Sequence, residues 1–331
     1  MFEHEPSTGR LRQRSSISET DPSWLAFDPA KRFLFAVSEG YGDQGAVVSF
    51  EIDSDTGGLR WLSRQSTGGG EPCHLCVDPS GRFVIVANHE NGSVAVFPIN
   101  ADGSLEPASD FRQHAGSGPG PTQQGPHAHH VTFDPPGRRV LVTDKGIDQV
   151  VVYQLDLATG KLVPNDPPSG RVHAGAAPRH LAFGVAGRFA YVNGEADMTL
   201  SAFSYDGSTG RMRELQSVPT IPSGAPGPDD STAEVVVEPN GRFVYVSNRG
   251  PHSIAGFAID QVSGLLTTIG TVPTGGRTPR NISIDPSGSR MYAANQNSDT
   301  IVHFELDPLT GQLTPDGQVT EVGAPVCILF S

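Results

Sequence analysis

The stretch Val77-Asp-Pro-Ser-Gly-Arg82, followed by the apolar run Phe83-Val-Ile-Val-Ala87, is one of six closely similar stretches in this chain. The other five begin at Phe27, Phe133, Phe183, Val237 and Ile284, and successive copies start about 47 to 56 residues apart. A period of this length is typical of a repeated four-stranded sheet rather than of a helical repeat. The repeat therefore predicts an architecture, and that architecture separates scaffold residues from candidate site residues.

Each repeat is expected to contain four short strands, described here for the second copy. Strand A covers His74–Asp78, strand B covers Phe83–Ala87 and strand C covers Ser93–Phe97, and strand D is expected to begin near Leu105. β-Branched and aromatic residues fill the strands. Pro, Gly, Asn and Asp lie in the turns, where their backbone preferences favour chain reversal.

Four-stranded sheets repeated radially form a β-propeller, and the turn between strands C and D occurs seven times. We therefore predict an all-β, seven-bladed β-propeller in which residues 1–331 form a single domain. Both chain ends are expected to close the seventh blade, with strand A from Pro325–Phe330 and strand D from the segment after Gly9. Phe2 aligns with Phe50 at the end of strand C, so roughly 18 residues of the closing blade have no counterpart. The N-terminal part of that blade is thus expected to be missing.

Composition limits the classes of partner. The formal net charge of −13 argues against nucleic acid or an anionic membrane as a general partner. No apolar run approaches the length of a membrane span and no secretory signal is visible, so a soluble, cytoplasmic protein is expected. Cys73, Cys76 and Cys327 are too few for a disulfide framework. We interpret the C-x-x-C pair as small buried residues near the axis.

The order of strands sorts the loops by face. The A–B and C–D turns of a propeller share one face, and the B–C loops and D–A connections share the other, called here the upper mouth. The first face receives the arginines of the repeated turn, namely Arg32, Arg82, Arg138, Arg188, Arg242 and Arg290. Because they recur in nearly every blade, we interpret them as scaffold rather than as a phosphate site.

The upper mouth differs from blade to blade. Before strand A lie His74, His127, His129, His130, Arg179, His180, Glu234 and Arg280; after strand B lie Asn88, His89, Asp144, Lys145, Glu195, Asn248, Arg249, Asn295 and Gln296. Two long connections, 111–126 and 217–230, end at this face, where sites on rigid scaffolds are usually built. An acidic chain that gathers arginines and histidines at one mouth is expected to bind a small, anionic, oxygen-rich ligand there.

Each candidate also has a structural interpretation. His127, His129 and His130 have a spacing that can chelate a metal, but no carboxylate or cysteine lies nearby in sequence, so we expect no metal and no cofactor. Glu195 could simply neutralise Arg179 or Arg249, because charges near a buried axis usually pair. A non-catalytic interaction module is a further alternative. It predicts apolar or aromatic clusters at the upper mouth, whereas this face is polar and charged.

Eight stretches carry a resemblance: Pro126-His-Ala-His129, Pro178-Arg-His180, Tyr191-Val-Asn-Gly-Glu195, Ala233-Glu234, Val246-Ser-Asn-Arg-Gly250, Thr278-Pro-Arg280, Ala294-Asn-Gln296 and Pro325-Val-Cys327. In order along the whole chain, they resemble the seven-bladed lactonase family, which includes cycloisomerase-type 6-phosphogluconolactonases and the fungal carboxymuconate lactonizing enzyme. One departure is visible. The family usually reads Asn-Glu where this chain has Asn193-Gly-Glu195, and the additional glycine could shift Glu195 relative to the pocket.

The resemblance implies that a lactone ring is opened, or formed, at the upper mouth. For hydrolysis of 6-phosphogluconolactone or a related sugar lactone it implies His129 or Glu195 as base and Arg179 as the group that stabilises the oxyanion. The substrate-binding set is then Arg249 and Arg280 for the phosphate, with His127, Glu234 and Gln296. In the alternative, a carboxylated muconate-type substrate is cyclised or opened by the same arginines, with a proton transferred to or from carbon.

Overall fold

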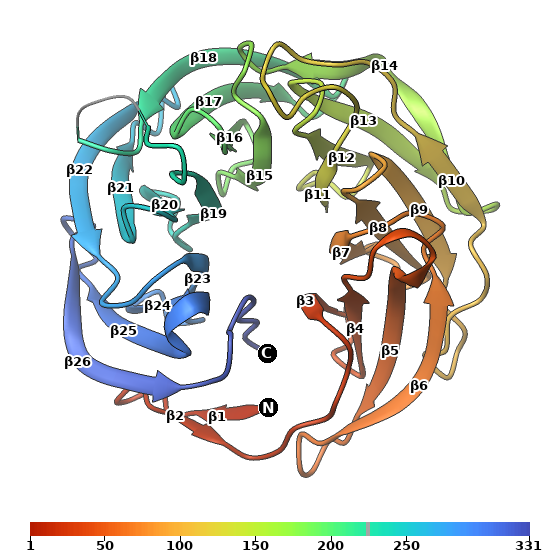
Figure 1. The fold of residues 1–331 in the computed structure, drawn as a ribbon, viewed down its shortest axis with the longest axis horizontal. Coiled ribbons are helices and arrows are strands. Elements are labelled where there is room, and N and C mark those ends of the chain that lie inside the picture. Colours follow the sequence, from red (N-terminus) through yellow and green to blue (C-terminus); the bar gives the residue numbers. More distant parts are fainter. Residues whose placement is uncertain (223–225) are drawn as a thin grey trace.

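The computed structural model describes residues 1–222 and 226–331. The chain forms six four-stranded antiparallel sheets around a central axis, with a two-stranded sheet between the first and the last of them (Figure 1). Two short 3-10 turns, Gly42–Gln44 and Gln296–Ser298, are the helical elements of the described residues. The predicted all-β propeller is confirmed.

Each sheet is one blade whose first strand lies near the axis and whose fourth strand lies at the periphery (Figure 1). The first three blades are β3 (Pro22–Phe27), β4 (Phe33–Ser38), β5 (Ala46–Ile52) and β6 (Leu59–Ser66); β7 (Pro72–Val77), β8 (Phe83–Asn88), β9 (Ser93–Pro98) and β10 (Asp110–Gln113); and β11 (Ala128–Phe133), β12 (Arg139–Asp144), β13 (Gln149–Asp156) and β14 (Lys161–Arg171). The next three are β15 (Pro178–Phe183), β16 (Phe189–Gly194), β17 (Thr199–Asp206) and β18 (Arg211–Pro219); β19 (Thr232–Val237), β20 (Phe243–Asn248), β21 (Ser253–Ile259) and β22 (Leu266–Pro273); and β23 (Pro279–Ile284), β24 (Arg290–Asn295), β25 (Thr300–Leu306) and β26 (Leu313–Glu321).

Strands A, B and C of the second blade are found as predicted, as β7, β8 and β9. Strand D begins later than predicted, because Leu105 takes part only in an isolated bridge to Ile99 and β10 starts at Asp110. Pro107 lies between them and has no N–H to donate to the ladder. Pairing with β9 resumes at Asp110, opposite Val96.

The repeated turn between strands A and B is held by its own carboxylate. Asp78 is 1% exposed, and its Oδ1 accepts hydrogen bonds from the backbone N–H groups of Arg82 and Phe83, both at 2.7 Å. Gly81 has a φ of 72°, in the left-handed region that glycine adopts without steric penalty. The Arg82 guanidinium lies 5.8 Å from the ring centre of Phe83. The arginine of this turn therefore makes a scaffold contact.

Neighbouring blades pack through apolar side chains of their strands. Phe35 and Val47 of the first blade share a buried cluster with Val86 and Phe97 of the second. Similar clusters join each neighbouring pair up to the sixth blade. Burial of these side chains is the main stabilising contribution to the ring.

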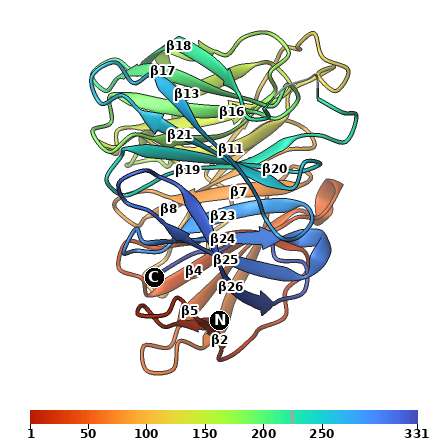
Figure 2. The same ribbon diagram turned by 90° about the vertical axis from the view of Figure 1, so that its left-hand side faces the viewer.

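The sector between the first and sixth blades is built differently, and we call it the seam. Both chain ends lie there (Figures 1 and 2), and β1 (Phe2–His4) pairs with β2 (Leu11–Gln13). The C-terminal segment 325–330, predicted as strand A of a seventh blade, is not assigned as a strand. Its contact with the sixth blade runs through a side chain, since the Ile328 N–H donates to Asn281 Oδ1 at 3.0 Å.

Two cavities, of about 920 and 830 Å³, lie at the seam. Leu25 and Leu34 of the first blade line both, together with the side chains of the chain ends. Within the described residues, no helix is long and apolar enough to cross a membrane.

Candidate active site

Two positions that recur in every blade build the upper mouth. The first is the start of the innermost strand, where the pairing register shifts, as between Pro178 and Leu181 of β15. Such a bulge re-aims the side chains beside it. The second position directly follows strand B, where a backbone N–H donates to the carbonyl that precedes strand A. Lys145 N donates to His127 O in this way at 2.9 Å.

The second position carries five residue types in the six blades. These residues are Glu39, His89, Lys145, Glu195, Arg249 and Gln296. Glu195 N donates to Ala177 O at 3.0 Å, the same bond that the other five make. The additional Gly194 completes β16 and leaves Glu195 in register, so the shift considered from the sequence does not occur.

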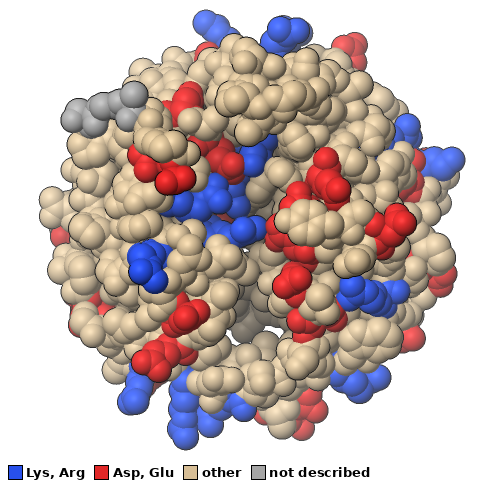
Figure 3. Space-filling view, viewed as in Figure 1, with Lys and Arg blue, Asp and Glu red and all other residues tan. Residues whose placement is uncertain are grey.

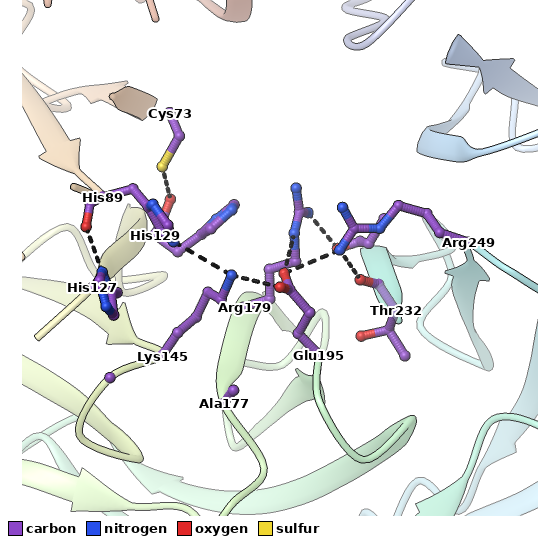
Figure 4. A network of polar contacts seen from close by, with 12 residues as sticks. Cys73, His89, His127, His129, Lys145, Ala177, Arg179, Glu195, Thr232 and Arg249 are labelled. Carbon is purple, nitrogen blue, oxygen red and sulfur yellow. Dashed lines mark hydrogen bonds and ion pairs between the residues drawn. The ribbon is translucent and has the colours of Figure 1, made fainter. Parts of the chain in front are cut away.

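Glu195 is the centre of a charged cluster (Figure 4). Its Oε1 accepts a hydrogen bond from Lys145 Nζ at 2.5 Å, and its Oε2 lies 3.0 Å from Arg179 Nε and 3.1 Å from Arg249 Nη2. Burial raises the pKa of Glu195, but the charges of Lys145, Arg249 and Arg179 outweigh it and hold the pKa well below its ordinary value. The carboxylate is therefore ionised, and its oxygens are occupied by three cations.

Arg179 lies deepest in this cluster, with 3% of its surface exposed. Its Nη1 donates to Ala233 O at 2.6 Å and lies 3.2 Å from His180 Nε2. Burial, followed by the charge of Arg249, lowers the pKa of Arg179 to about 10, so the guanidinium stays charged at neutral pH. Its Nε is buried and contacts Glu195 as an ion pair without hydrogen-bond geometry.

A second group of buried side chains is connected to Arg179 through His180. His180 Nδ1 lies 2.9 Å from Glu234 Oε1, and Glu234 Oε2 accepts a hydrogen bond from Asn281 Nδ2 at 2.7 Å. Since His180 Nε2 faces the Arg179 donor, Nδ1 carries the proton and donates to Glu234. Burial raises the pKa of Glu234 to about 7. Glu234, predicted to bind substrate, is thus engaged by protein groups beneath the mouth.

The two predicted histidines occupy different places. His129 is buried, its ring centre lies 5.1 Å from that of His180, and burial lowers its pKa well below the ordinary value. His127 lies at the rim, where its ring stacks on His89 at 4.9 Å and its Nδ1 donates to His89 O at 2.9 Å. Both rings neighbour His89, whose ring centre lies 4.9 Å from that of His127 and 5.7 Å from that of His129.

The third predicted arginine also separates from the cluster. Arg280 Nη2 lies 3.2 Å from Glu39 Oε2, so Arg280 has a counter-ion of its own. Its charge still reaches Arg179, whose pKa it lowers. Gln296 occupies the position after strand B in the sixth blade, and its N–H donates to Thr278 O at 3.0 Å.

Glu39, His89 and Lys145 belong to the mouth but were absent from the predicted site. A signal for all three was present, because each directly follows a strand B, as Glu195 and Arg249 do. The part of the chain that the structure describes contains no group of three or more His, Cys, Asp or Glu side chains arranged to hold a metal ion. Of the predicted long connections, 217–230 includes residues 223–225, which lie outside the described residues.

The distribution of charged side chains also indicates the upper mouth as the candidate site. Lys and Arg side chains gather at the centre of the ring, whereas Asp and Glu are spread around it (Figure 3). The cavities at the seam have mainly apolar linings. The fold and the mouth together define a β-propeller with a cationic site at one end of its channel.

Comparison with known proteins gives the family. The family model described as "Lactonase, 7-bladed beta-propeller" matches residues 1–330. The chain is 36% identical over 261 residues to a 6-phosphogluconolactonase of Bacillus subtilis, covering 79% of this chain and 73% of that one. It is 31% identical to a 6-phosphogluconolactonase of Formosa agariphila, covering 86% and 81%. The solved structure of a periplasmic gluconolactonase, PpgL, of Pseudomonas aeruginosa has a TM-score of 0.92 at 33% identity, covering 98% and 92%. The chain belongs to the seven-bladed β-propeller lactonase family.

Proposed function

We propose that this chain hydrolyses a sugar lactone at the upper mouth, and that the substrate is 6-phosphogluconolactone, opened to 6-phosphogluconate. Family membership and the relatives of that name support the reaction. The cluster around Glu195 is the observation that carries the proposal. Three cations, Lys145, Arg179 and Arg249, meet one carboxylate, which leaves a surplus of two positive charges. A phosphate dianion complements that surplus.

The contacts suggest how the roles are divided. Arg179, whose guanidinium stays charged at neutral pH, stabilises the oxyanion that develops on the lactone carbonyl. Arg249 and Arg280 hold the phosphate, and His127 and Gln296 complete the binding surface. Glu234, predicted to bind substrate, contributes through His180, with which it is bonded. Glu195 orients the cations rather than accepting a proton, since a carboxylate with a lowered pKa is a weak base. The proton acceptor is therefore a histidine.

A comparison of initial rates tests the substrate. We expect a higher kcat/KM on 6-phosphogluconolactone than on gluconolactone or a carboxylated muconolactone. Arg249→Ala should lower kcat/KM on the phosphorylated lactone by about tenfold to a hundredfold, the cost of one charge-assisted pair. Its effect on gluconolactone should be smaller. Arg277→Ala, at an exposed arginine bonded to Asn297 O, is the control. Equal losses on both lactones would contradict the phosphate assignment.

Unphosphorylated gluconolactone is the second candidate substrate. The structural similarity to a periplasmic gluconolactonase favours it. We place the present protein in the cytoplasm, with a small anionic lactone as its partner and neither nucleic acid nor membrane. Cell fractionation followed by immunodetection checks this location, and a periplasmic signal would favour the gluconolactone alternative.

We also propose that β1, β2 and segment 325–330 together form an incomplete seventh blade, so that residues 1–331 are one folding unit. Ala324 has a φ of 41° and is followed by Pro325. The same pattern begins β7 and β23, where Glu71 and Thr278 have φ values of 50° and 57° and are followed by proline. Hydrogen exchange tests this, since strand-like protection of 325–330 and a single unfolding transition are expected.

A further inference from the structure

We propose that His89 is the general base that removes a proton from the attacking water, with Glu71 and His127 positioning its ring. This inference rests on the proposed lactone hydrolysis and deepens it. His89 follows β8 at the position that Glu195 and Arg249 occupy in their own blades. Its side chain therefore enters the same mouth from the second blade.

Three contacts fix the ring of His89. Its Nδ1 lies 3.0 Å from Glu71 Oε2, and its backbone N–H donates to Glu71 O, also at 3.0 Å. The His127 ring stacks on it with 4.9 Å between ring centres and 28° between planes. His127 Nδ1 in turn donates to His89 O. A histidine oriented by a carboxylate has the arrangement that general bases use.

The tautomer follows from the partners. His89 Nε2 lies 3.4 Å from Lys145 Nζ, and an ammonium group can only donate. Nε2 is therefore the unprotonated nitrogen, and Nδ1 carries the proton and donates to Glu71. Lys145 Nζ makes its short hydrogen bond, 2.5 Å, to Glu195 Oε1 (Figure 4). Its contact with His89 Nε2 is at the long limit of a hydrogen bond, so the attacking water displaces only this contact when it donates to Nε2.

Exposure separates His89 from the other histidines of the channel. The side chain of His89 is 27% exposed. His129 is only 5% exposed and His180 only 2%. A base that takes a proton from water and returns it to a leaving group must reach the water-filled mouth. His89 does so, whereas the predicted base His129 is buried next to it, with 5.7 Å between the ring centres.

The charges around His89 keep it neutral. The titratable groups that face its ring are Glu71, His127, His129, Lys145 and Glu195. Burial, then Lys145, lowers the pKa of His89, while Glu71 and Glu195 act in the opposite direction and do not offset the fall. The imidazole is thus in its basic form at neutral pH, as a proton acceptor must be.

The proton balance closes within the site. Water oxygen bonds to the lactone carbonyl carbon while one water proton passes to His89 Nε2, and the carbonyl π electrons move onto its oxygen beside Arg179. Collapse of this intermediate re-forms the carbonyl and breaks the bond to the ring oxygen. That oxygen takes the proton from the His89 imidazolium. The new carboxylic acid ionises and releases its proton to solvent.

His89→Asn tests the assignment. We expect kcat on 6-phosphogluconolactone to fall about 10²- to 10⁴-fold, the usual contribution of a general base, with little change in KM. The wild-type pH profile of kcat/KM should rise through a pKa below 6.5, and this acidic limb should disappear in the variant. His173→Asn is the matched control, because His173 is also bonded to carboxylates, Asp197 and Glu214, but lies outside the cluster.

Glu71→Gln supplies a second, independent readout. Glu71 raises the pKa of His89, so its removal should move the acidic limb to lower pH while much of kcat remains. Titration calorimetry with 6-phosphogluconate should show binding retained in both variants, which excludes misfolding. An active wild type with an unchanged pH limb in His89→Asn overturns the inference alone. The inference is also overturned if the acidic limb of the kcat/KM profile disappears in His129→Asn but not in His89→Asn. An inactive wild type overturns the proposed function as well.

Discussion

At the level of single residues, Glu195 shows how three cations change the behaviour of one carboxyl group. Its partners Lys145, Arg179 and Arg249 come from three different blades, and Glu195→Gln would leave all three without their counter-ion at almost constant volume. We expect a loss of stability on the order of 3 kcal/mol at neutral pH, together with a large loss of turnover.

The same loss should depend on pH. The pKa of Glu195 is depressed in the folded chain, so its contribution to stability is complete above the ordinary value of 4.5. It is lost as pH falls below that value toward the folded pKa. Urea unfolding of wild type and Glu195→Gln at about pH 7 and about pH 3.5 measures this. The difference in free energy of unfolding between wild type and Glu195→Gln should be smaller at the acidic pH. An equal difference at both pH values would contradict a stabilising charge on Glu195.

Glu234 should behave in the opposite way. Burial raises its folded pKa from 4.5 to about 7, so the unfolded chain ionises first as the pH rises. The contribution of Glu234 to stability should therefore decline between about pH 4.5 and 7, by up to about 3 kcal/mol, while buried histidines with lowered pKa values, such as His129 and His180, act in the opposite direction in wild type and variant alike. Glu234→Gln should remove that decline, whereas Glu305→Gln, at an exposed position in β25, should retain it. Thermal melting of wild type and of both variants across this pH range measures the difference.

Residue type and position predicted which side chains lie at the upper mouth, but not which of them form ion pairs with each other. Arg179 and Arg249 do share Glu195, as their chemistry suggested. Arg280 instead pairs with Glu39, which is not among the predicted site residues. Pairing depends on how far each side chain extends across the axis and on which neighbour is nearest. Neither quantity is encoded in the repeat.

At the level of elements, the turn between strands A and B offers a natural comparison. In the second blade, Asp78 binds three backbone N–H groups of this turn, but the fourth blade has Gly184 at the equivalent position. A Cβ at Gly184 would have its nearest neighbour, Phe189 O, at 3.6 Å, which is ordinary contact. Gly184→Asp should therefore supply the missing acceptor and raise stability by about 1 kcal/mol.

Asp78→Ala is the converse change. It leaves buried N–H groups without an acceptor, so we expect a loss of about 1–3 kcal/mol. Thermal melting of both variants and of wild type tests the pair. A Gly184→Asp protein less stable than wild type would show that this turn does not need its carboxylate.

The repeat predicted strands A to C well because each contains alternating β-branched residues beside a fixed turn. It predicted strand D poorly, since Pro107, which has no N–H for the ladder, lies between the isolated bridge at Leu105 and the start of β10 at Asp110. The repeat also did not predict how the chain ends pair at the seam. A strand forms there only if a neighbouring strand is present, and segment 325–330 is attached to Asn281 by a side-chain contact instead.

At the level of the whole molecule, a hydrogen-bonded path connects the seam to the active site. The Ile328 N–H donates to Asn281, Asn281 donates to Glu234, and Glu234 accepts from His180. His180 Nε2 then faces Arg179 Nη1 at 3.2 Å. The C-terminal segment therefore contributes to holding Arg179 in place, although it lies outside the mouth.

Ile328→Pro tests this connection because proline removes the one N–H at the start of the path. Asn281 Oδ1 then loses its donor, at a cost of about 1–3 kcal/mol, and Tm should fall by about 5 °C. Because Asn281 positions Glu234 and His180 beneath Arg179, kcat should fall too. Ile328→Val keeps the N–H and should retain kcat. Phe330→Ala, which removes the ring 5.2 Å from His4, should lower Tm alone. If Ile328→Pro and Phe330→Ala lower Tm equally and leave kcat unchanged, the seam closes the ring without acting on the site.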